Sequence, residues 1–206
     1  QALGVSIPTV SRALKDSPEI SRELCAKAKA LAKEMNYRPN PFAMSLRKNA
    51  PRIIGVIVPD IVTHFFASIL NGIENMAIAN GYFVIITTSH ESYEHEKRNI
   101  ENLVNMRVEG IIACLSQETT DFSHISALKD INMPLILFDR VCLTDQFSSV
   151  IADGAQSAQM ATQHLLDNGS KRVAFIGGAN HLDIVKRRKH GYLEALRENR
   201  IPIEKE

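Results

Sequence analysis

The stretch that decides how the first part of this chain folds is residues 3–14, Leu-Gly-Val-Ser-Ile-Pro-Thr-Val-Ser-Arg-Ala-Leu. Gly4 can supply the positive φ of a tight turn, Ser6 is a good N-cap, and Pro8 falls in the first helical turn, where its missing N–H costs little. The apolar residues that follow recur at helical spacing: Val10, Ala13 and Leu14. The stretch therefore predicts a tight turn followed by a helix that begins near Ile7.

The apolar stripe leaves the other side chains at the start of this helix pointing outward. These are Ile7, Pro8, Thr9, Ser11 and Arg12, with the N-cap Ser6 beside them. A helix-turn-helix protein places this end of its recognition helix against base edges in the major groove. We predict a DNA-binding helix, and the alternative is an ordinary capped surface helix.

The distribution of charge favours DNA binding. Residues 1–52 carry ten Lys and Arg against four Asp and Glu, whereas the rest of the chain carries fourteen against nineteen. A basic segment attracts a phosphate backbone, and a mildly acidic remainder does not bind nucleic acid over its whole surface. We expect the lysines of residues 27–33 to attract phosphate generally, and the alternative is a solvated run of charge.

A second helix is predicted to begin at Ser21 and to end at residues 37–39, Tyr-Arg-Pro. Asn40 can then cap a short helix over residues 41–48 that starts with a proline. At about two turns this helix is too short to be stable alone in water, so we expect it to form only with a partner. Residues 49–51, Asn-Ala-Pro, form a linker.

Apolar runs alternate with amphipathic helical stretches from Ile53 onward. Strands are expected at 53–58, 82–87, 110–115, 134–138, 149–152 and 172–176, and helices at 64–80, 94–106, 122–131, 156–167 and 184–199. Strict alternation predicts right-handed βαβ units in a doubly wound parallel sheet that is covered on both faces. The last strand and helix look like the start of a second sheet.

Ligands bind at the carboxyl ends of the strands in such sheets. Carboxylates, a guanidinium and aromatic rings follow the predicted strands here: Asp60, Phe65, Phe66, Asp139, Arg140 and Asp153. These groups suit a small polyhydroxylated or heterocyclic ligand, because rings stack and charged groups form directional hydrogen bonds. The alternative is that polar loop residues follow strands in any fold of this kind.

Other function classes lack their motifs. The sequence has no dinucleotide or P-loop glycine pattern, no Cys-x-x-Cys, no His-Glu-x-x-His and no Gly-x-Ser-x-Gly. His90 and His95 are the best imitation of a metal site, but their spacing of five fits a solvated loop better. We therefore predict a protein that is not an enzyme, with neither metal nor cofactor.

The bulk properties predict a cytoplasmic protein. No stretch of about 18 uninterrupted apolar residues and no charged-then-apolar leader is present. The three cysteines are unclustered, which is typical of reduced structural thiols. The chain begins without an initiator methionine, so we expect that an upstream segment has been left out.

Taken together, these residues resemble the LacI/GalR family of transcriptional repressors. Its pattern Gly-Val-Ser-x-x-Thr-Val-Ser-Arg matches residues 4–12, and its Tyr-x-Pro-Asn before a hinge helix matches residues 37–40. The resemblance implies that Leu46 is the wedge inserted into the minor groove at the operator centre. The expected DNA-binding set is Ser6, Ile7, Pro8, Thr9, Ser11, Arg12, Ser21, Tyr37, Asn40, Ala43 and Leu46.

The resemblance also implies a fold class and an effector site. The fold is a small all-α helix-turn-helix head over residues 1–48, followed by an α/β periplasmic-binding-protein-like domain over residues 49–206. That domain divides into an N-subdomain, 49–151, and the start of a C-subdomain, 152–206, with an effector cleft between them. The family motifs place effector contacts at Phe65, Phe66, Arg140, Asp153 and Arg188.

Three departures from the family pattern stand out. Leu24-Cys25 replaces the usual Thr-Arg, which puts one phosphate contact in doubt, and Thr63-His64 replaces Asn-Pro, which can change the ligand class. By comparison with the family, the first helix of the helix-turn-helix and most of the second subdomain are absent.

The resemblance implies a DNA-binding repressor that works as a homodimer, since one recognition helix per half-site needs a two-fold partner. Its expected partners are operator DNA and a small-molecule effector, a sugar in preference to a purine, and no membrane. The alternative is a solute-binding receptor of an importer, which the basic head and the lack of an export signal disfavour.

Overall fold

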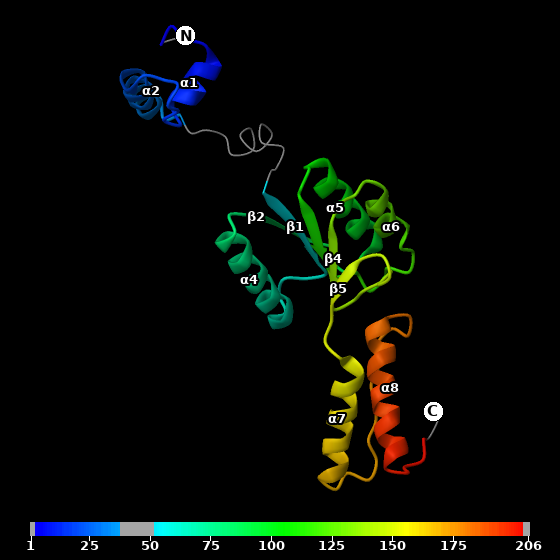
Figure 1. Ribbon diagram of the computed structural model, residues 1–206. Helices are drawn as coiled ribbons and strands as arrows, with labels where there is room; N and C mark the ends of the chain where they lie inside the picture. The colour runs from blue at the N-terminus through cyan, green and yellow to red at the C-terminus, as the bar shows by residue number, and fades with distance from the viewer. Residues whose placement is uncertain (1–2, 38–51, 204–206) are drawn as a thin grey trace. The chain divides into compact units, whose positions relative to one another are not determined.

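The computed structural model describes residues 3–37 and 52–203 (Figure 1). The chain divides into two compact units, Gln1–Ala50 and Pro51–Glu206. We call the described residues of the first unit the head and those of the second the body. None of the helices in the described ranges is long and apolar enough to cross a membrane.

The head contains two helices, α1 (Ile7–Ala13) and α2 (Arg22–Glu34). Gly4 has the positive φ expected of the turn, 61°. The side chains of Ser6 and Ser21 cap the two helices by accepting hydrogen bonds from the third residue beyond them. The helices pack around a small core made of Ala13, Cys25 and Ala28 with Leu3, Leu14 and Ile20 against it. The predicted turn, caps and apolar stripe are therefore present.

The body is built on a five-stranded parallel sheet. Its strands are β1 (Ile53–Val58), β2 (Phe83–Thr88), β3 (Gly110–Ala113), β4 (Leu135–Phe138) and β5 (Ser148–Val150). Their order is β2-β1-β3-β4-β5, so successive connections run outward in both directions from β1. This is a doubly wound order, as predicted, and ligands bind such sheets at the carboxyl edge near the point where the order reverses.

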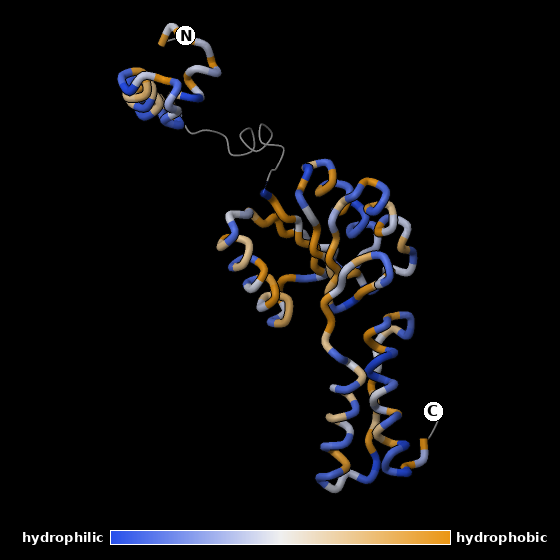
Figure 2. The backbone as a smooth tube through the Cα atoms, in the orientation of Figure 1, coloured by the Kyte–Doolittle hydropathy of each residue, from blue (hydrophilic) through white to orange (hydrophobic). Residues whose placement is uncertain are grey.

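Helices cover both faces of the sheet. On one face lies α4 (His64–Ala79), which packs Phe66 and Leu70 against Val56, Val58 and Phe138. On the other face lie α5 (Tyr93–Asn105) and α6 (Ser123–Asp130). The strands include the most continuously hydrophobic stretches of the body (Figure 2). The central strand β1 is buried at five of its six positions, as cover on both faces requires, whereas β5 at the sheet edge is exposed throughout.

Two further helices, α7 (Gly154–Asp167) and α8 (Asp183–Glu198), lie side by side beyond β5 (Figure 1). They approach closely at Gly191, where a Cβ atom would lie 1.9 Å from the carbonyl oxygen of Ala155. Only glycine permits this approach, because a real Cβ cannot come so near a backbone oxygen.

The predicted strand over residues 172–176 is wrong: these residues form no strand. A strand is defined by its hydrogen-bonding neighbour, and no described residue supplies one here. Instead the segment runs against α8, where the Tyr192 hydroxyl donates to the carbonyl of Val173 at 2.8 Å. The ring of Phe175 stacks on Tyr192 with centroids 5.4 Å apart.

Candidate functional site

The first candidate site is the N-terminal end of α1. Ile7 is 86% exposed, and Pro8 and Arg12 are also exposed. The Ser6 and Thr9 hydroxyls lie 2.8 Å apart. This end of α1 therefore presents an apolar side chain, two hydroxyls and a guanidinium to the surroundings, which are groups that contact base edges and phosphates.

Arg12 has one ion-pair partner within the head. Its Nη1 lies 3.2 Å from Oε2 of Glu19, and the two side chains are 59% and 68% exposed. An exposed pair of this kind contributes about 0–1 kcal/mol. The pair is therefore weak enough for a phosphate or a guanine edge to displace Glu19.

The basic residues of α2 are less free than the charge count suggested. Lys27 pairs with Glu23 at 2.8 Å, and Lys29 pairs with Asp16 at 2.5 Å. Two of the three lysines expected to attract phosphate thus already have a carboxylate partner. Counting charges could not show this, because Asp16 lies thirteen residues from Lys29.

The remaining predicted DNA contacts differ in their exposure, and some lie outside the described residues. Ser21 caps α2, with its hydroxyl accepting from Leu24 N–H at 3.3 Å, and it is exposed. Ser11 is partly exposed, and Tyr37 just beyond α2 is 57% exposed. The other three predicted contacts, Asn40, Ala43 and Leu46, lie outside the described residues.

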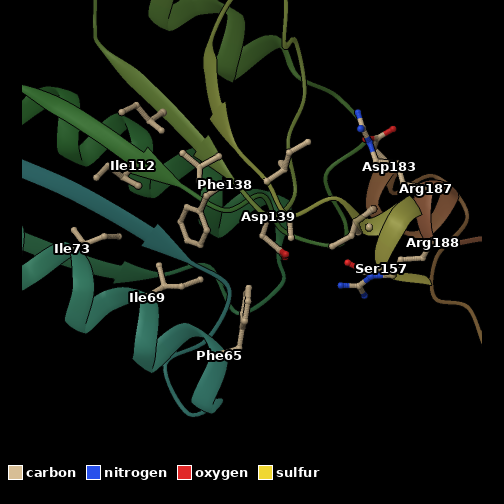
Figure 3. A pocket seen from close by; sticks show the side chains of 16 residues that line it. Phe65, Ile69, Ile73, Ile112, Phe138, Asp139, Ser157, Asp183, Arg187 and Arg188 are labelled. Atoms are coloured by element: carbon tan, nitrogen blue, oxygen red, sulfur yellow. The ribbon is translucent and has the colours of Figure 1, made fainter. Parts of the chain in front are cut away.

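The second candidate site is a pocket of about 620 Å³ in the body (Figure 3). It opens at the carboxyl edge of the sheet and is bounded by the start of α4, the ends of β4 and β5, and the starts of α7 and α8. Its lining consists of Phe65, Ile69, Ile73, Ile112, Ile136, Phe138, Asp139, Val150, Ile151, Ala152, Gly154, Ser157, Asp183, Ile184, Arg187 and Arg188. This volume suits a small metabolite.

The pocket has one apolar and one polar wall. Figure 3 shows Phe65, Ile69 and Ile73 on one side and Arg187 and Arg188 on the other. Phe65 is half exposed, so its ring is available for stacking. An aromatic face opposite guanidinium groups can hold a ligand that has an apolar ring face and several polar substituents.

Asp139 lies at the floor of the pocket and has an uncommon backbone conformation and a raised carboxyl pKa. Its φ is 58°, in the left-handed region that few residues other than glycine adopt. Partial burial raises the pKa of its carboxyl, although the nearby charges of Arg140 and Arg188 oppose the shift. Burial makes the ionised carboxylate unfavourable unless a partner stabilises it, so this group is suited to bind hydroxyl or amine groups of a ligand.

The polar wall is ordered by local contacts on α8. Arg187 pairs with Asp183 one turn earlier in the helix. The side chain of Arg188 lies over Gly154, where a Cβ would meet its Cγ at 3.4 Å. The start of α7 therefore has little room for a larger residue at position 154.

Two of the five predicted effector contacts, Phe65 and Arg188, line the pocket. Phe66 does not, because it is buried in the core, with its ring 5.1 Å from Phe65 and 6.4 Å from Phe138. Asp153 does not either, because its carboxylate caps α7 by accepting from the N–H groups at positions 155 and 156.

Arg140 also lies away from the pocket wall. Its guanidinium forms a two-pronged pair with Glu91, at 2.6 and 3.0 Å, and donates to the Leu115 carbonyl at 3.2 Å. In this structure Arg140, Phe66 and Asp153 do not line the pocket, and each is held by a contact within the fold.

Sequence reasoning missed three polar lining residues: Ser157, Asp183 and Arg187. Asp139, which also lines the pocket, was expected among the polar groups at the strand ends, since it is the first residue after β4. For α8 the signal was the i, i+4 spacing of Asp183 and Arg187 in its first two turns. No local feature of the sequence indicated that Ser157 lines the pocket.

The described residues give little support for a metal site or for a reactive cysteine. Within the described ranges, His, Cys, Asp and Glu nowhere form a group of three that could hold a metal ion. The rings of His90 and His95 lie 6.0 Å apart, edge to face. Burial raises the pKa of Cys114 and of Cys142 to about 12, so both thiols are protonated at neutral pH.

Comparison with known proteins covers both units. A family model described as bacterial regulatory proteins, lacI family, matches residues 1–40. A second model, described as periplasmic binding proteins and sugar binding domain of LacI family, matches residues 52–206. The two matches together take in both the head and the body.

Individual relatives agree with these models. Catabolite control protein A of Priestia megaterium is 33% identical over 204 residues, which cover 97% of this chain and 60% of that protein. The Lac repressor dimer bound to operator and the anti-inducer ONPF superposes with a TM-score of 0.77 at 26% identity, covering 97% of this chain and 60% of that one.

A third relative carries a sugar. It is a periplasmic binding protein/LacI transcriptional regulator from Alkaliphilus metalliredigens complexed with D-xylulofuranose. Its TM-score is 0.63 at 28% identity, covering 74% of this chain and 55% of that one. The chain spans about 60% of the length of the curated relatives it matches.

Proposed function

This chain belongs to the LacI family of bacterial regulatory proteins, and from that premise we propose that it is a sequence-specific DNA-binding repressor controlled by a small-molecule effector. The predicted fold class, a helix-turn-helix head followed by a periplasmic-binding-protein-like α/β domain, is confirmed. The protein acts by binding and not by catalysis, and it works in the cytoplasm, where its operator lies.

The observation that carries DNA binding is the exposed N-terminal end of α1. Ile7 at 86% exposure has no partner in the core of the head, and the one ion pair of Arg12 among the described residues is a weak surface pair. Residues 1–40 match the regulatory-protein model, which a solute receptor of an importer would have no reason to do. One recognition helix reads one half-site, so the active form is a homodimer on a two-fold operator.

The pocket carries the effector part of the proposal. A half-exposed Phe65 faces Asp139 and Arg188 across a space of about 620 Å³. Sugars suit this arrangement because their C–H face stacks on an aromatic ring while their hydroxyls bond to charged groups. A relative complexed with D-xylulofuranose supports a sugar over a nucleobase.

The test is a two-part binding experiment on the full-length protein. Operator candidates are first selected from random duplexes, and binding is measured by fluorescence anisotropy against a scrambled duplex of the same length. A repressor should prefer the selected duplex by about 10³-fold or more at physiological salt. Equal affinity for both duplexes would contradict the proposal.

The second part identifies the effector. Pentoses, hexoses, their phosphates and nucleobases are screened by thermal shift, because a ligand that binds only the folded state raises the melting temperature. A sugar that stabilises the wild-type protein but not the Phe65→Ala variant supports the pocket assignment. Stabilisation by nucleobases alone would replace the sugar by a purine or pyrimidine.

A further inference from the structure

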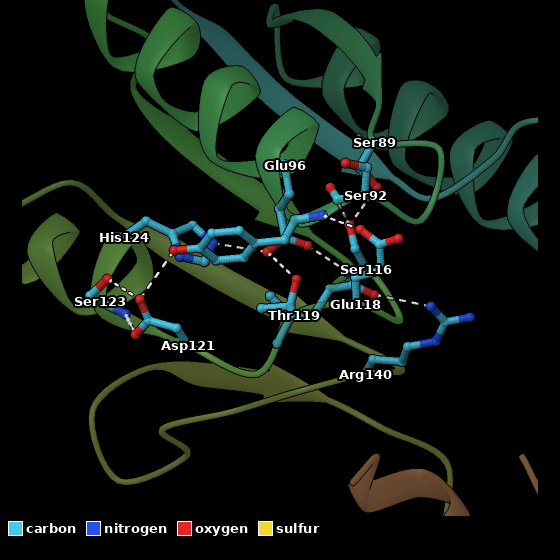
Figure 4. Close-up of polar contacts among 12 residues, drawn as sticks. Ser89, Ser92, Glu96, Ser116, Glu118, Thr119, Asp121, Ser123, His124 and Arg140 are labelled. Atoms are coloured by element: carbon cyan, nitrogen blue, oxygen red, sulfur yellow. Dashed lines mark hydrogen bonds and ion pairs between the residues drawn. The ribbon is translucent and has the colours of Figure 1, made fainter. Parts of the chain in front are cut away.

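The loop that follows β3 is fixed by two carboxylates from different elements. Glu96 of α5 is fully buried and accepts hydrogen bonds from Ser116 N–H, from the Thr119 hydroxyl at 2.9 Å and from His124 Nε2 at 2.8 Å (Figure 4). The next amide along the loop, at position 117, donates to a carboxylate oxygen of Glu91 at 2.7 Å. The N–H groups of two consecutive residues are therefore hydrogen-bonded to two different carboxylates. We call residues 116–119, which these bonds hold in place, the strut.

The backbone that brings Glu91 to the strut adopts an energetically unfavourable conformation. His90 and Glu91 both have positive φ, 52° and 62°, at the end of β2. Residues other than glycine adopt this region at an energetic cost, so two in succession indicate a contact that compensates. That contact is the two-pronged pair with Arg140, whose side chain is only 18% exposed.

The charge state of Glu91 fits this arrangement. Burial raises the pKa of its carboxyl, but the hydrogen bonds from Arg140 and from the backbone of Gln117 outweigh burial, so the pKa is lowered overall. Glu91 is therefore ionised at neutral pH. An ionised acid with a two-pronged arginine pair is among the strongest polar contacts in proteins.

The residue of the strut that bonds to Glu91, Gln117, also contacts the other side of the pocket. The Nε2 of His181 lies 2.7 Å from the carbonyl oxygen of Gln117, so its N–H donates to that oxygen. His181 stands two residues before Asp183, which lines the polar wall. On the Glu91 side, Arg140, the partner of Glu91, directly follows Asp139 on the pocket floor. Two parts of the pocket are therefore joined by a chain of contacts outside it.

We propose that Glu91 and His181 are positioning residues: through the 116–119 strut they hold the α7–α8 pair against the sheet edge and set the width of the pocket before a ligand binds. This inference rests on the proposed effector site. Neither residue lines the pocket. Their effect on affinity is indirect, because a pocket that is already ordered costs less to close on a ligand.

The width of the pocket can be measured without any ligand. Nitroxide labels are attached at Asn71→Cys on α4 and Lys189→Cys on α8, both exposed positions outside the pocket lining. The three native cysteines are buried and react slowly. Pulsed electron double resonance on the full-length, unliganded protein then gives the distribution of distances between the two labels.

Four further changes are compared on this labelled background. His181→Ala removes the donor to Gln117, whereas His181→Gln retains an N–H that can reach the same carbonyl. Glu91→Gln removes the charge from the pair with Arg140. His190→Ala is the matched control, since this exposed histidine lies on α8 and does not line the pocket.

The proposal predicts broader distance distributions in His181→Ala and Glu91→Gln, a wild-type distribution in His190→Ala and recovery in His181→Gln. Recovery separates positioning from a general loss of stability. A wild-type distribution in either of the first two variants overturns the role of the residue changed. A broadened His181→Gln distribution overturns the hydrogen bond as the cause.

A ligand readout completes the test and keeps the two proposals apart. If D-xylulose, the sugar of the solved relative, binds the wild-type protein, its affinity should fall about two- to tenfold in His181→Ala. Failure of every sugar to bind would contradict the proposed effector while leaving the distance measurement valid. Unchanged distances with normal sugar binding would overturn only the strut.

Discussion

Arg12→Ala is the substitution that best separates base reading from general phosphate attraction. Within the head the side chain has only its exposed pair with Glu19, at 3.2 Å, so its loss should cost the fold about 0–1 kcal/mol. A two-pronged contact of arginine with a guanine is worth about 1–3 kcal/mol of discrimination. The expected loss on operator is therefore about 5- to 150-fold for each half-site, with the melting temperature nearly unchanged.

The assay is fluorescence anisotropy on the selected operator and on a scrambled duplex at several salt concentrations. A base contact weakens operator binding and spares the scrambled duplex, whereas a phosphate contact weakens both and reduces the salt dependence. Glu19→Gln is the matched control, because it frees the guanidinium and should bind both duplexes somewhat more tightly. Unchanged operator affinity in Arg12→Ala, or a large fall in its melting temperature, would refute the reasoning.

Three other outcomes follow from the body. Phe65→Ala should abolish sugar-induced thermal stabilisation with little change in the free energy of unfolding. Phe66→Ala should lower the free energy of unfolding, measured in urea, by about 3–5 kcal/mol because it leaves a cavity in the core. Equal losses in the two variants would contradict the different positions of the two rings. Gly191→Ala should lower the melting temperature by several degrees or prevent folding, since its Cβ would lie 1.9 Å from the Ala155 carbonyl oxygen, and a wild-type melting temperature would contradict that close approach. Burial raises the pKa of Asp139, so its ionised form destabilises the fold, and this cost disappears as the pH falls through the raised pKa. Asp139→Asn should therefore be more stable than wild type at neutral pH, with an advantage that shrinks on acidification; an advantage that grows would show the opposite sign.

Sequence periodicity predicted the architecture because each element of the sheet is specified locally. The β1 run, Ile53–Val58, is apolar throughout, as a strand buried on both faces must be. Ser6 and Ser21 mark helix starts because their side chains can satisfy free N–H groups at those ends. The exception is the segment 172–176, whose apolar character alone could not supply a neighbouring strand.

The direction of individual side chains at the pocket was harder to predict. Phe65 and Phe66 are adjacent, so they differ by about 100° around α4. The spacing of Phe66 with Leu70 and Ala77 places it on the buried stripe of that helix, and this signal was available in the sequence. The direction of Arg140 had no local signal, because its partner Glu91 lies 49 residues earlier in the chain.

The central claim is that a ligand in the body pocket controls the affinity of the head for DNA. The most direct measurement is the operator Kd of the full-length protein with and without a sugar that raises its melting temperature, in parallel with the Arg188→Ala variant. Effector and operator coupling in such proteins is typically about 1–3 kcal/mol, which is about a 5- to 150-fold change in Kd. The account predicts such a change in the wild-type protein and its loss in the variant at the same sugar concentration. A sugar that fills the pocket but leaves the operator Kd of the wild-type protein unchanged would contradict it.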